Sequence, residues 1–495
     1  MAGGRAELAA LTAAAARDEE TGREELRGTA RGGLANLLGA AVSGAGGLAI
    51  TWLAAMALSP AEAGAFFAAT SVFLLAGGLA RLGTPTGLVY WVARLHRNGR
   101  DGAVGSVLRL GLWPAAIASM ATALGLLLAA PMFERPDLVR LIAVFLPASV
   151  AMEALLAATR GYRLMGPSVV IDKLGRTVAQ LIGLGAIALA GTASAATVTF
   201  AWALPYLPAA LAAGWYLLRR HRASRPDQGF PDRVSARAFW GFTAPRAAAG
   251  VAHLGLQRLD IIMVAALAGL GPAAVYTVAT RFVIVGQLAS GAVGQSVQPR
   301  AAAAMAAGEP ASAQALYQTS TAWIVGLTWP VYLAVGLLAD WYLRLFGGEY
   351  ATGDARLVVW VLVPAMMVSS ACGVVDSMLS MAGKTSWQLI DVSVSLVVNV
   401  GLNLALIPTM GVVGAAIAWS AAVLVNNLMP LAQLWRTFGL HPFGALTKRT
   451  LLAAGLGFGA VPLAAAPFGP WWTLGALAVA GLAWAVVMLR YRAAI

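Results

Sequence analysis

Residues 258–281 read RLDIIMVAALAGLGPAAVYTVATR, and this stretch places three charged side chains inside an otherwise apolar hairpin. The hairpin turns at residues 269–272. Asp260 and Arg281 each stand about ten residues from that turn, which is roughly 15 Å along a helix and corresponds to the middle of a bilayer. Ionisable groups at that depth are costly and usually face a cavity or the protein interior. Arg258, Asp260 and Arg281 are therefore candidates for a functional site.

A purely structural interpretation of the same residues remains open. Asp260 could pair with Arg281 and only tie two helices together. Under that interpretation Arg258 is a third charge without a counterpart, so the hairpin carries net positive charge that an Asp260–Arg281 pair does not explain.

Composition identifies the broad class of the protein. The chain has 495 residues, of which 59% are apolar and 11% charged, and its mean hydropathy is +0.76. This is too apolar for a soluble core and predicts a polytopic, all-α membrane protein. Cys372 is the single cysteine and the four histidines are scattered, so the sequence predicts neither a disulfide nor a metal centre.

Hydropathy predicts about fourteen transmembrane spans. They are expected at residues 33–57, 65–93, 103–130, 139–163, 168–190, 194–218, 239–268, 272–298, 316–338, 355–382, 386–408, 411–435, 449–468 and 470–489. Pro85-Thr-Gly87 and Pro330 are expected to bend the helices that contain them. Residues 1–32 are Ala-rich and charged, show no cleavable signal, and are expected to form a cytoplasmic tail.

Basic residues predict the orientation of the spans. With the N-terminus in the cytoplasm, most of the 34 basic residues fall inside, among them Arg94, Arg97, Arg160, Arg163, Lys173, Arg176 and the run from Arg219 to Arg237. Only Arg135, Arg140, Arg344 and Arg356 fall outside. The positive-inside rule therefore predicts a multi-pass protein of the bacterial cytoplasmic membrane with both termini in the cytoplasm. The net charge of +13 is explained by topology, and no nucleic acid partner is expected.

Internal repeats predict two lobes. AGAFFAAT at 63–70 aligns with AAVYTVAT at 273–280, and Pro147–Gly166 matches Pro364–Gly383 in length. Because six spans separate equivalent helices, the lobes have the same orientation and form a parallel repeat. The sequence predicts an N-lobe of six helices at 33–218, a cytoplasmic linker at 219–238, a C-lobe of six helices at 239–436, and two further helices at 449–489.

A wider set of charged residues is expected to complete the site. It consists of Arg81, Arg109, Arg246 and Glu153, which lie within spans nearer their cytoplasmic ends. Together with Arg258 and Arg281 these arginines would form a cationic cavity wall, which suits an anionic substrate that bears phosphate. The alternative is that Arg81, Arg109 and Arg246 extend to the lipid headgroups.

Several polar residues within spans have two open interpretations. Asn399 and Asn403 stand one turn apart, and Gln287, Gln295 and Gln298 share another span. These amides could hydrogen-bond a sugar or link helices, and linking is the commoner role. No phosphate-binding glycine loop, acidic triad or nucleophile arrangement is visible. The sequence therefore predicts a transporter and not an enzyme, without a cofactor.

Three stretches resemble a known family. LSPAEAGAF at 58–66, LDIIMV at 259–264 leading to AVYTVATR at 274–281, and IPTMGVVGAAIA at 407–418 are similar to the bacterial polysaccharide flippases of the multidrug, oligosaccharidyl-lipid and polysaccharide (MOP) exporter superfamily. The resemblance covers roughly residues 33–436. It implies two six-helix lobes around a central cationic cavity, which move a polyprenyl-diphosphate-linked oligosaccharide to the outer leaflet by alternating access.

The sequence departs from the family pattern in its expected number of helices. Many O-antigen flippases have twelve helices, whereas fourteen is similar to the lipid II flippase, in which the added pair offers a groove for the lipid tail. The arginine-rich first helix expected of a lipid II flippase is missing here. As partners the resemblance implies membrane lipids, the lipid-linked glycan and polysaccharide polymerases.

Two alternatives compete with a flippase. A cation-coupled multidrug exporter of the same fold would favour an acidic cavity, whereas this one is predicted to be basic. A membrane glycosyltransferase or polymerase would need catalytic residues on a sizeable external loop, and the predicted external loops are short. Coupling to a proton or sodium gradient is compatible with the sequence, which does not identify the ion.

Overall fold

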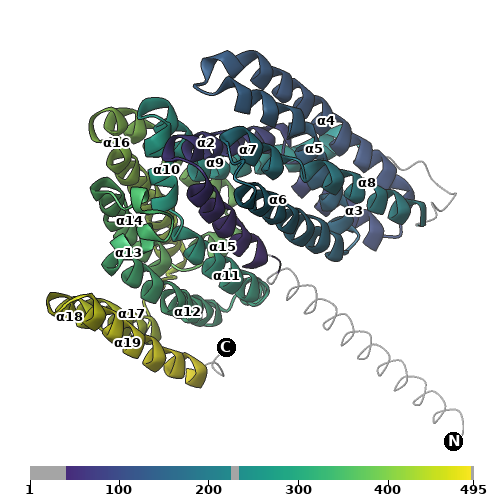
Figure 1. The fold of residues 1–495 in the computed structure, drawn as a ribbon. Helices are drawn as coiled ribbons and strands as arrows, with labels where there is room; N and C mark the ends of the chain where they lie inside the picture. The colour runs from purple at the N-terminus through teal and green to yellow at the C-terminus, as the bar shows by residue number, and fades with distance from the viewer. Residues whose placement is uncertain (1–38, 40, 224–233, 492–495) are drawn as a thin grey trace, which may run out of the picture.

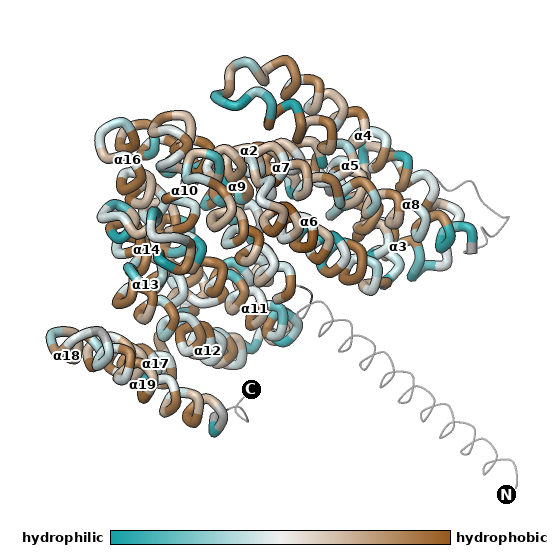
Figure 2. The backbone as a smooth tube through the Cα atoms, in the orientation of Figure 1, coloured by the Kyte–Doolittle hydropathy of each residue, from teal (hydrophilic) through white to brown (hydrophobic). Residues whose placement is uncertain are grey.

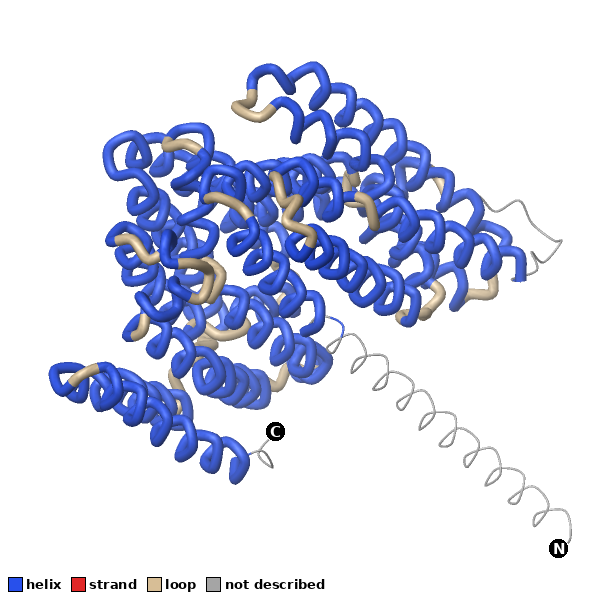
Figure 3. The backbone as a smooth tube through the Cα atoms, in the orientation of Figure 1, coloured by secondary structure: helices blue, strands red, loops and turns tan. Residues whose placement is uncertain are grey.

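The computed structural model describes residues 39, 41–223 and 234–491, and within these ranges every regular element is helical (Figure 3). The predicted tail at 1–32 and the middle of the predicted linker lie outside the described residues. The helices form two bundles that meet along α2 and α9, with a separate C-terminal group at one side (Figure 1).

The first bundle contains the helices before the linker. A helix at Ala41–Ala57 comes first. It is followed by α2 (Pro60–Ala80), α3 (Thr84–Arg97), η1 (Asp101–Ala103), α4 (Val104–Ala129), η2 (Ala130–Met132), α5 (Pro136–Gly161), the π-helix η3 (Ser168–Arg176), α6 (Thr177–Leu189), α7 (Ala195–Ala203) and α8 (Tyr206–Ala223).

The second bundle and the C-terminal group follow the linker. The bundle contains α9 (Ala236–Leu267), α10 (Leu270–Ala279), α11 (Val283–Ala306), α12 (Pro310–Leu337), α13 (Ala339–Arg344), η4 (Gly348–Tyr350), α14 (Gly353–Ala371), α15 (Val375–Met381) and α16 (Thr385–Phe438). The group consists of α17 (Ala445–Ala454), the π-helix η5 (Gly455–Ala460), α18 (Val461–Ala465), η6 (Ala466–Phe468) and α19 (Pro470–Tyr491).

The prediction of an all-α polytopic membrane protein is confirmed. Ten helices in the described ranges are long and apolar enough to cross a membrane, and α10 with α11 makes an eleventh span, bent by 46°. Hydrophobic residues recur along most of the helices (Figure 2). The count of fourteen stays a prediction, because several expected spans are divided into shorter helices.

The expected span at 65–93 is one of those that are divided. α2 ends at Ala80 and α3 begins at Thr84, with Leu82 and Gly83 in the left-handed region at φ 51° and 69°. A Cβ atom on Gly83 would lie 2.9 Å from the Cα of Ala247, so α9 passes directly over the break. A chain with two successive left-handed residues cannot continue a helix, and the span becomes two helices.

The expected spans at 386–408 and 411–435 meet at a break within α16. Gly411 has φ 56° and ψ −133°, which are not helical values. A Cβ atom on Gly414 would lie 2.4 Å from the carbonyl oxygen of Leu406, eight residues earlier. Residues that far apart in a straight helix would be about 12 Å from each other, so the chain turns sharply at Gly411.

An arginine stands at the break of one helix in each lobe. Arg81 follows α2, and its Nε donates a hydrogen bond to the carbonyl oxygen of Gly77 at 3.0 Å. Arg281 follows α10, and its Nε donates to the carbonyl oxygen of Thr277 at 2.9 Å. In each lobe the arginine side chain therefore adds a hydrogen bond to a carbonyl in the last turn of the interrupted helix. This shared arrangement agrees with the predicted parallel repeat, which itself stays a prediction.

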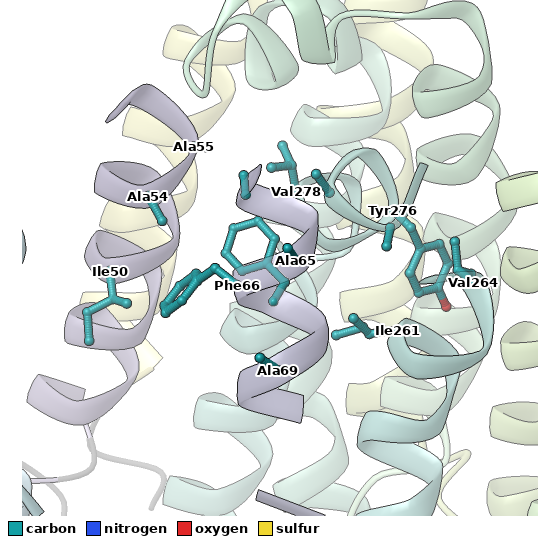
Figure 4. Packing of buried hydrophobic residues seen from close by; sticks show 14 of the residues in the cluster. Ile50, Ala54, Ala55, Ala65, Phe66, Ala69, Ile261, Val264, Tyr276 and Val278 are labelled. Atoms are coloured by element: carbon teal, nitrogen blue, oxygen red, sulfur yellow. The ribbon is translucent and has the colours of Figure 1, made fainter. Parts of the chain in front are cut away.

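Tight packing joins the two lobes at one end. A Cβ atom on Gly64 of α2 would lie 1.7 Å from the carbonyl oxygen of Leu270 at the start of α10, so the helices touch through their backbones. Phe66 lies between the first helix and α2, while Ile261 and Val264 of α9 lie on the other side of α2 (Figure 4). One buried cluster therefore continues across the lobes.

α9 contributes to both lobes. Phe239, near its start, is fully buried and packs with Leu88 and Val92 of α3 in the first lobe. Ile261 and Val264, near its end, belong to the cluster that includes α10. The lobe boundary at residue 238 stays a prediction. Phe239, which directly follows that boundary in the sequence, packs against the first lobe.

The C-terminal group lies on the outer side of α12, away from the first lobe (Figure 1). Trp484 of α19 donates from Nε1 to the carbonyl oxygen of Gly326 at 2.8 Å, and Thr447 donates to that of Gln318 at 3.0 Å. A Cβ atom on Gly326 would lie 2.6 Å from the Cε atom of Met488, so this glycine permits the close contact.

Candidate functional site

Three arginines line a cavity of about 250 Å³ between the two lobes, which we call the interlobe cavity. Arg258 and Arg281 come from the second lobe and Arg176 from the first. The described lining contains no carboxylate. The other lining residues are Ser43, Gly47, Ile50, Thr51, Phe66, Phe67, Thr70, Ser71, Leu74, Thr177, Gln180, Trp202, Tyr206, Ile261 and Thr277.

Arg176 is held rigidly by its neighbours. Its Nε donates to Asp172 at 2.7 Å, and Nη1 donates to Gln180 at 3.0 Å. The guanidinium carbon lies 4.9 Å from the centre of the Tyr206 ring. These contacts fix the guanidinium at the cavity wall before any ligand binds, which lowers the cost of ordering on binding.

Arg258 and Arg281 are less fully satisfied. The buried Nε of Arg258 has no hydrogen-bond partner among the described residues. Arg281 uses Nε to bind the Thr277 carbonyl, and no described residue receives a hydrogen bond from its terminal nitrogens. Buried donors are normally paired, so these two guanidinium groups have capacity for an anionic ligand.

Asp260 is buried and receives hydrogen bonds from two other helices. Asn403 of α16 donates from Nδ2 at 2.8 Å, and the Tyr276 hydroxyl of α10 donates at 3.3 Å. Asp260 forms no ion pair with Arg258 or Arg281 within the described residues. The carboxylate therefore ties helices together, as the structural interpretation expected, but its partners are Tyr276 and Asn403 instead of Arg281.

A second cavity of about 100 Å³ adjoins the first, and we call it the bridging cavity. It shares Arg258, Ile261 and Arg281 with the interlobe cavity. Its lining also includes Asp260 and Gln287. The structure thus brings together Arg258, Asp260 and Arg281, the three charged residues of the apolar hairpin at 258–281.

The four remaining predicted site residues lie elsewhere. Arg81 of α2 forms an ion pair with Glu153 of α5 through Nη1. Arg109 is exposed on α4 and donates to the Gly105 carbonyl at 3.3 Å. Arg246 is exposed on α9. None of the four lines the interlobe or the bridging cavity, so their substrate role is a prediction that the geometry does not support.

Arg246 has a local explanation for its position. Its Nη1 donates to the Phe242 carbonyl at 2.9 Å, and its guanidinium carbon lies 3.9 Å from the centre of the Phe242 ring. Phe242 in turn stacks on Tyr90 with ring centres 3.9 Å apart. Arg246 therefore covers an aromatic contact between α9 and α3.

Arg176 and Tyr206 line the cavity but are not predicted as site residues by the sequence. The positive-inside pattern assigns Arg176 to a cytoplasmic loop, whereas it ends the π-helix η3 and lines the cavity. Its four-residue spacing from both Asp172 and Gln180 was the available signal, since such residues share one helix face. Tyr206 had no comparable signal, because its role depends on the position of α8 relative to η3.

Comparisons with known proteins agree with this geometry. Residues 245–405 match the family model described as MatE. The solved structure of the lipid II flippase MurJ in an inward closed conformation superposes with a TM-score of 0.68 at 12% identity, covering 93% of this chain and 98% of that one. No curated protein sequence matches the chain significantly.

Two further solved structures share the fold. An inward-facing multidrug resistance MATE transporter of the MOP superfamily has a TM-score of 0.65 at 14% identity and covers 83% of this chain and 96% of that one. A MOP superfamily transporter from Pyrococcus furiosus, described as having a binding pocket of reverse polarity, has a TM-score of 0.55 at 15% identity, covering 83% and 95%.

These matches identify the fold of the protein. Residues 245–405 match the MatE family model, and the chain shares the fold of MOP superfamily transporters. The expected resemblance to that superfamily is confirmed at the level of the fold. The matched structures named above are all of transporters or flippases, which agrees with the class predicted for this chain.

Proposed function

We propose that this protein is a flippase that moves a polyprenyl-diphosphate-linked oligosaccharide from the cytoplasmic to the outer leaflet of the bacterial cytoplasmic membrane. Both termini are cytoplasmic in this proposal, and the cargo serves assembly of a cell-surface polysaccharide, with membrane lipids and a polysaccharide polymerase as partners. Arg176, Arg258 and Arg281 around the interlobe cavity, with no carboxylate in its described lining, are the observation that carries it.

Arginine chemistry supports a diphosphate as the recognised group. A guanidinium stays charged when it is buried, and it can bind phosphate oxygens through two parallel hydrogen bonds. Three of these groups converge from both lobes, and two of them have unused donors. A cationic drug would be repelled by the same lining.

The arrangement of helices supports alternating access. α2 and α10 touch through Gly64 and Leu270 at the end that the charge distribution places outside. The first helix, Ala41–Ala57, lies between the lobes, since Gly44 approaches Leu288 of α11 and Gly46 approaches Thr177 of α6. Separation of α2 from α10 would open the cavity outward.

The second candidate is a cation-coupled multidrug exporter, which is favoured by the MatE match over residues 245–405. The two candidates differ in the charge of their cargo. A flippase of this kind must bind a lipid diphosphate through its arginines, whereas an exporter of cationic drugs must bind an amine and would gain affinity when the arginines are neutralised.

A binding measurement with purified protein separates them. We expect the wild-type protein to bind farnesyl diphosphate and not a lipophilic cation such as tetraphenylphosphonium. Arg258→Gln and Arg281→Gln should each weaken farnesyl diphosphate binding about tenfold to a hundredfold, because each removes charge-assisted hydrogen bonds. Arg281→Lys should restore only part of the affinity, since the two-point geometry is lost.

Arg109→Gln provides the matched control, because Arg109 is exposed and lines neither cavity. It should bind farnesyl diphosphate like the wild type. Unchanged binding in both cavity variants, or tighter binding of tetraphenylphosphonium to the wild type than of farnesyl diphosphate, would reject the flippase proposal.

A further inference from the structure

A further cavity of the second lobe opens from the arginine site. It has a volume of about 510 Å³ and is lined by residues of α9, α11, α12, α14, α15 and α16; we call it the C-lobe cavity. It shares Gln257, Val283, Gln287 and Trp419 with the bridging cavity. The interlobe, bridging and C-lobe cavities are therefore consecutive, with Arg258 and Arg281 at the first junction.

The lining of the C-lobe cavity differs from that of the interlobe cavity. Its polar part combines four amide side chains, five hydroxyls, His253 and a single carboxylate, Asp376. Trp419 adds an indole ring, while the described lining contains no arginine or lysine. Amides, hydroxyls, one acid and an aromatic face form the combination that recognises hydroxyl groups on a compact ligand.

Several of these groups have no partner in the described protein. The side chains of Gln287 and Asn426 make no hydrogen bond to another described residue, and neither does the Asp376 carboxylate. The Asp376 side chain is exposed where it lines the cavity. Polar groups with free capacity inside a membrane-embedded bundle indicate a ligand or water that satisfies them.

We propose that the C-lobe cavity is the subsite for the sugar next to the diphosphate, and that it selects uncharged, hydroxyl-rich sugars over acidic ones. This inference rests on the proposed function, since a diphosphate on Arg258 and Arg281 directs the attached sugar through the bridging cavity into the C-lobe cavity, with which it shares Gln287 and Trp419. Gln287 and Asn426 bind sugar hydroxyls from two helices. Asp376 accepts a hydroxyl hydrogen bond and repels a carboxylate on the sugar.

The volume agrees with this role. At about 510 Å³ the cavity falls within the range of small-molecule sites, roughly 300–1,000 Å³. It has room for more than a lone phosphate. Its lining mixes hydrogen-bonding groups with apolar side chains such as Leu256, Met366 and Val423, and a sugar ring offers both hydroxyls and C–H faces to such a lining.

Three ligands test the subsite with the full-length protein: farnesyl diphosphate, farnesyl-diphosphate-linked glucose and farnesyl-diphosphate-linked glucuronic acid. We expect the wild type to bind the glucose ligand most tightly. Gln287→Leu and Asn426→Leu should each weaken the glucose ligand about tenfold and leave farnesyl diphosphate unchanged, because each removes a hydrogen bond to a hydroxyl. Asp376→Asn should strengthen binding of the glucuronic acid ligand about tenfold or more.

Gln298→Leu is the matched control. It makes the same substitution on the same helix, α11, three turns after Gln287, and Gln298 lines none of the three cavities. It should bind all three ligands like the wild type. Thermal unfolding of every variant identifies any that are misfolded, and Asp376→Asn gives an independent test because its expected effect is a gain.

The binding measurements can reject the proposed sugar subsite without rejecting the proposed diphosphate site. Equal wild-type affinity for farnesyl diphosphate and its glucose derivative overturns the subsite, and so does an equal loss of both ligands in Gln287→Leu and Asn426→Leu. If Arg281→Gln loses farnesyl diphosphate while the two leucine variants bind every ligand normally, only the subsite is wrong. If Arg281→Gln binds farnesyl diphosphate normally, the proposed function itself is wrong.

Discussion

Asp260 shows how a charged residue at membrane depth can serve the fold while its neighbours serve a ligand. Its carboxylate receives hydrogen bonds from Asn403 and Tyr276, and Asn403 also donates to Asn399 at 3.2 Å. Asn399 and Asn403 are fully buried, so the helix-linking interpretation of Asn403 agrees with its geometry. Arg258 and Arg281 remain outside this network, which leaves their charge available at the cavity.

Replacement of Asn403 should therefore affect stability. Asn403→Leu removes the shortest hydrogen bond to the buried Asp260 carboxylate, and we expect the free energy of unfolding to fall by about 1–3 kcal/mol. Thermal unfolding of the purified protein in detergent measures the change. Asn426→Leu is the control, since this residue lies on the same element but faces an accessible cavity, and its effect should stay within about 0.5 kcal/mol. Equal destabilisation by both would contradict the network.

Arg81 and Glu153 make a second residue-scale prediction. They join α2 to α5, and the pair lines neither the interlobe nor the bridging cavity. We expect Arg81→Gln and Glu153→Gln to destabilise the protein, with a coupling energy on the order of 1–3 kcal/mol in the double variant. Unfolding of the four proteins in parallel gives this value. Additive effects would mean that the two residues act independently, and substrate contact would then become the better explanation of Arg81.

The sequence was enough to predict the charged residues of the site, but not the residues that form hydrogen bonds with them. Arg258, Asp260 and Arg281 could be found because charges stand out in apolar sequence. The pairing of Asp260 with Asn403 could not, because the two residues are 143 positions apart and meet only through the packing of α9 on α16. Arg109 and Arg246 look like Arg281 in the sequence, and only the exposure of their side chains distinguishes them.

Among the elements, the interrupted helices were hardest to predict. A hydropathy average passes smoothly across residues 81–83, since Leu82 is apolar, α2 is apolar before it, and residues 88–93 of α3 are mostly apolar after it. Pro85-Thr-Gly87 was the available signal, and the bend it predicted occurs just before it, between α2 and α3. The reason for the break is the passage of Ala247 over Gly83, a contact between distant segments.

Contact between α2 and α10 gives an element-scale prediction. Gly64→Ala would place a methyl group 1.7 Å from the Leu270 carbonyl oxygen, so the two helices must separate. If this end faces outward, as proposed, the variant should favour an outward-open state. A cysteine at Ser71, which is buried at the interlobe cavity, should then react faster with an impermeant thiol reagent added outside.

Gly271→Ala is the control for this experiment. It also adds a methyl group near the start of α10, but no atom lies within 4 Å of the position that its Cβ would occupy. Labelling of Ser71→Cys should be as slow in this background as in the parent protein. Equal rates in the Gly64→Ala and Gly271→Ala backgrounds would show that the α2–α10 contact does not close the cavity.

For the whole molecule, the sequence predicted the class and the matched proteins confirmed the fold. Apolar periodicity and short loops were enough to predict an all-α bundle, because every membrane-spanning backbone group must be satisfied within its own helix. The place of α17 to α19 could not be predicted. These helices carry exposed apolar side chains at Trp472, Val479 and Leu482, and their hydropathy is the same whether they cover α12 or another helix.

The orientation of the whole molecule is the last prediction. Trp52 of the first helix donates from Nε1 to the Leu345 carbonyl at 2.7 Å, and Tyr350 donates to that of Ala55 at 3.5 Å. Residues near Ala61 and Ala351 therefore lie at one end of the bundle, while α3 carries the chain toward Gly99 at the other. With the N-terminus in the cytoplasm, the first end faces outward.

After replacement of the buried Cys372, cysteines at Ala61 and Ala351 should react with an impermeant reagent in intact cells, and a cysteine at Gly99 should react only after permeabilisation. Ser224 is expected to behave like Gly99, although it lies outside the described residues. Reversed labelling would overturn the orientation, and outside labelling of all the cysteines would overturn the spanning arrangement between them.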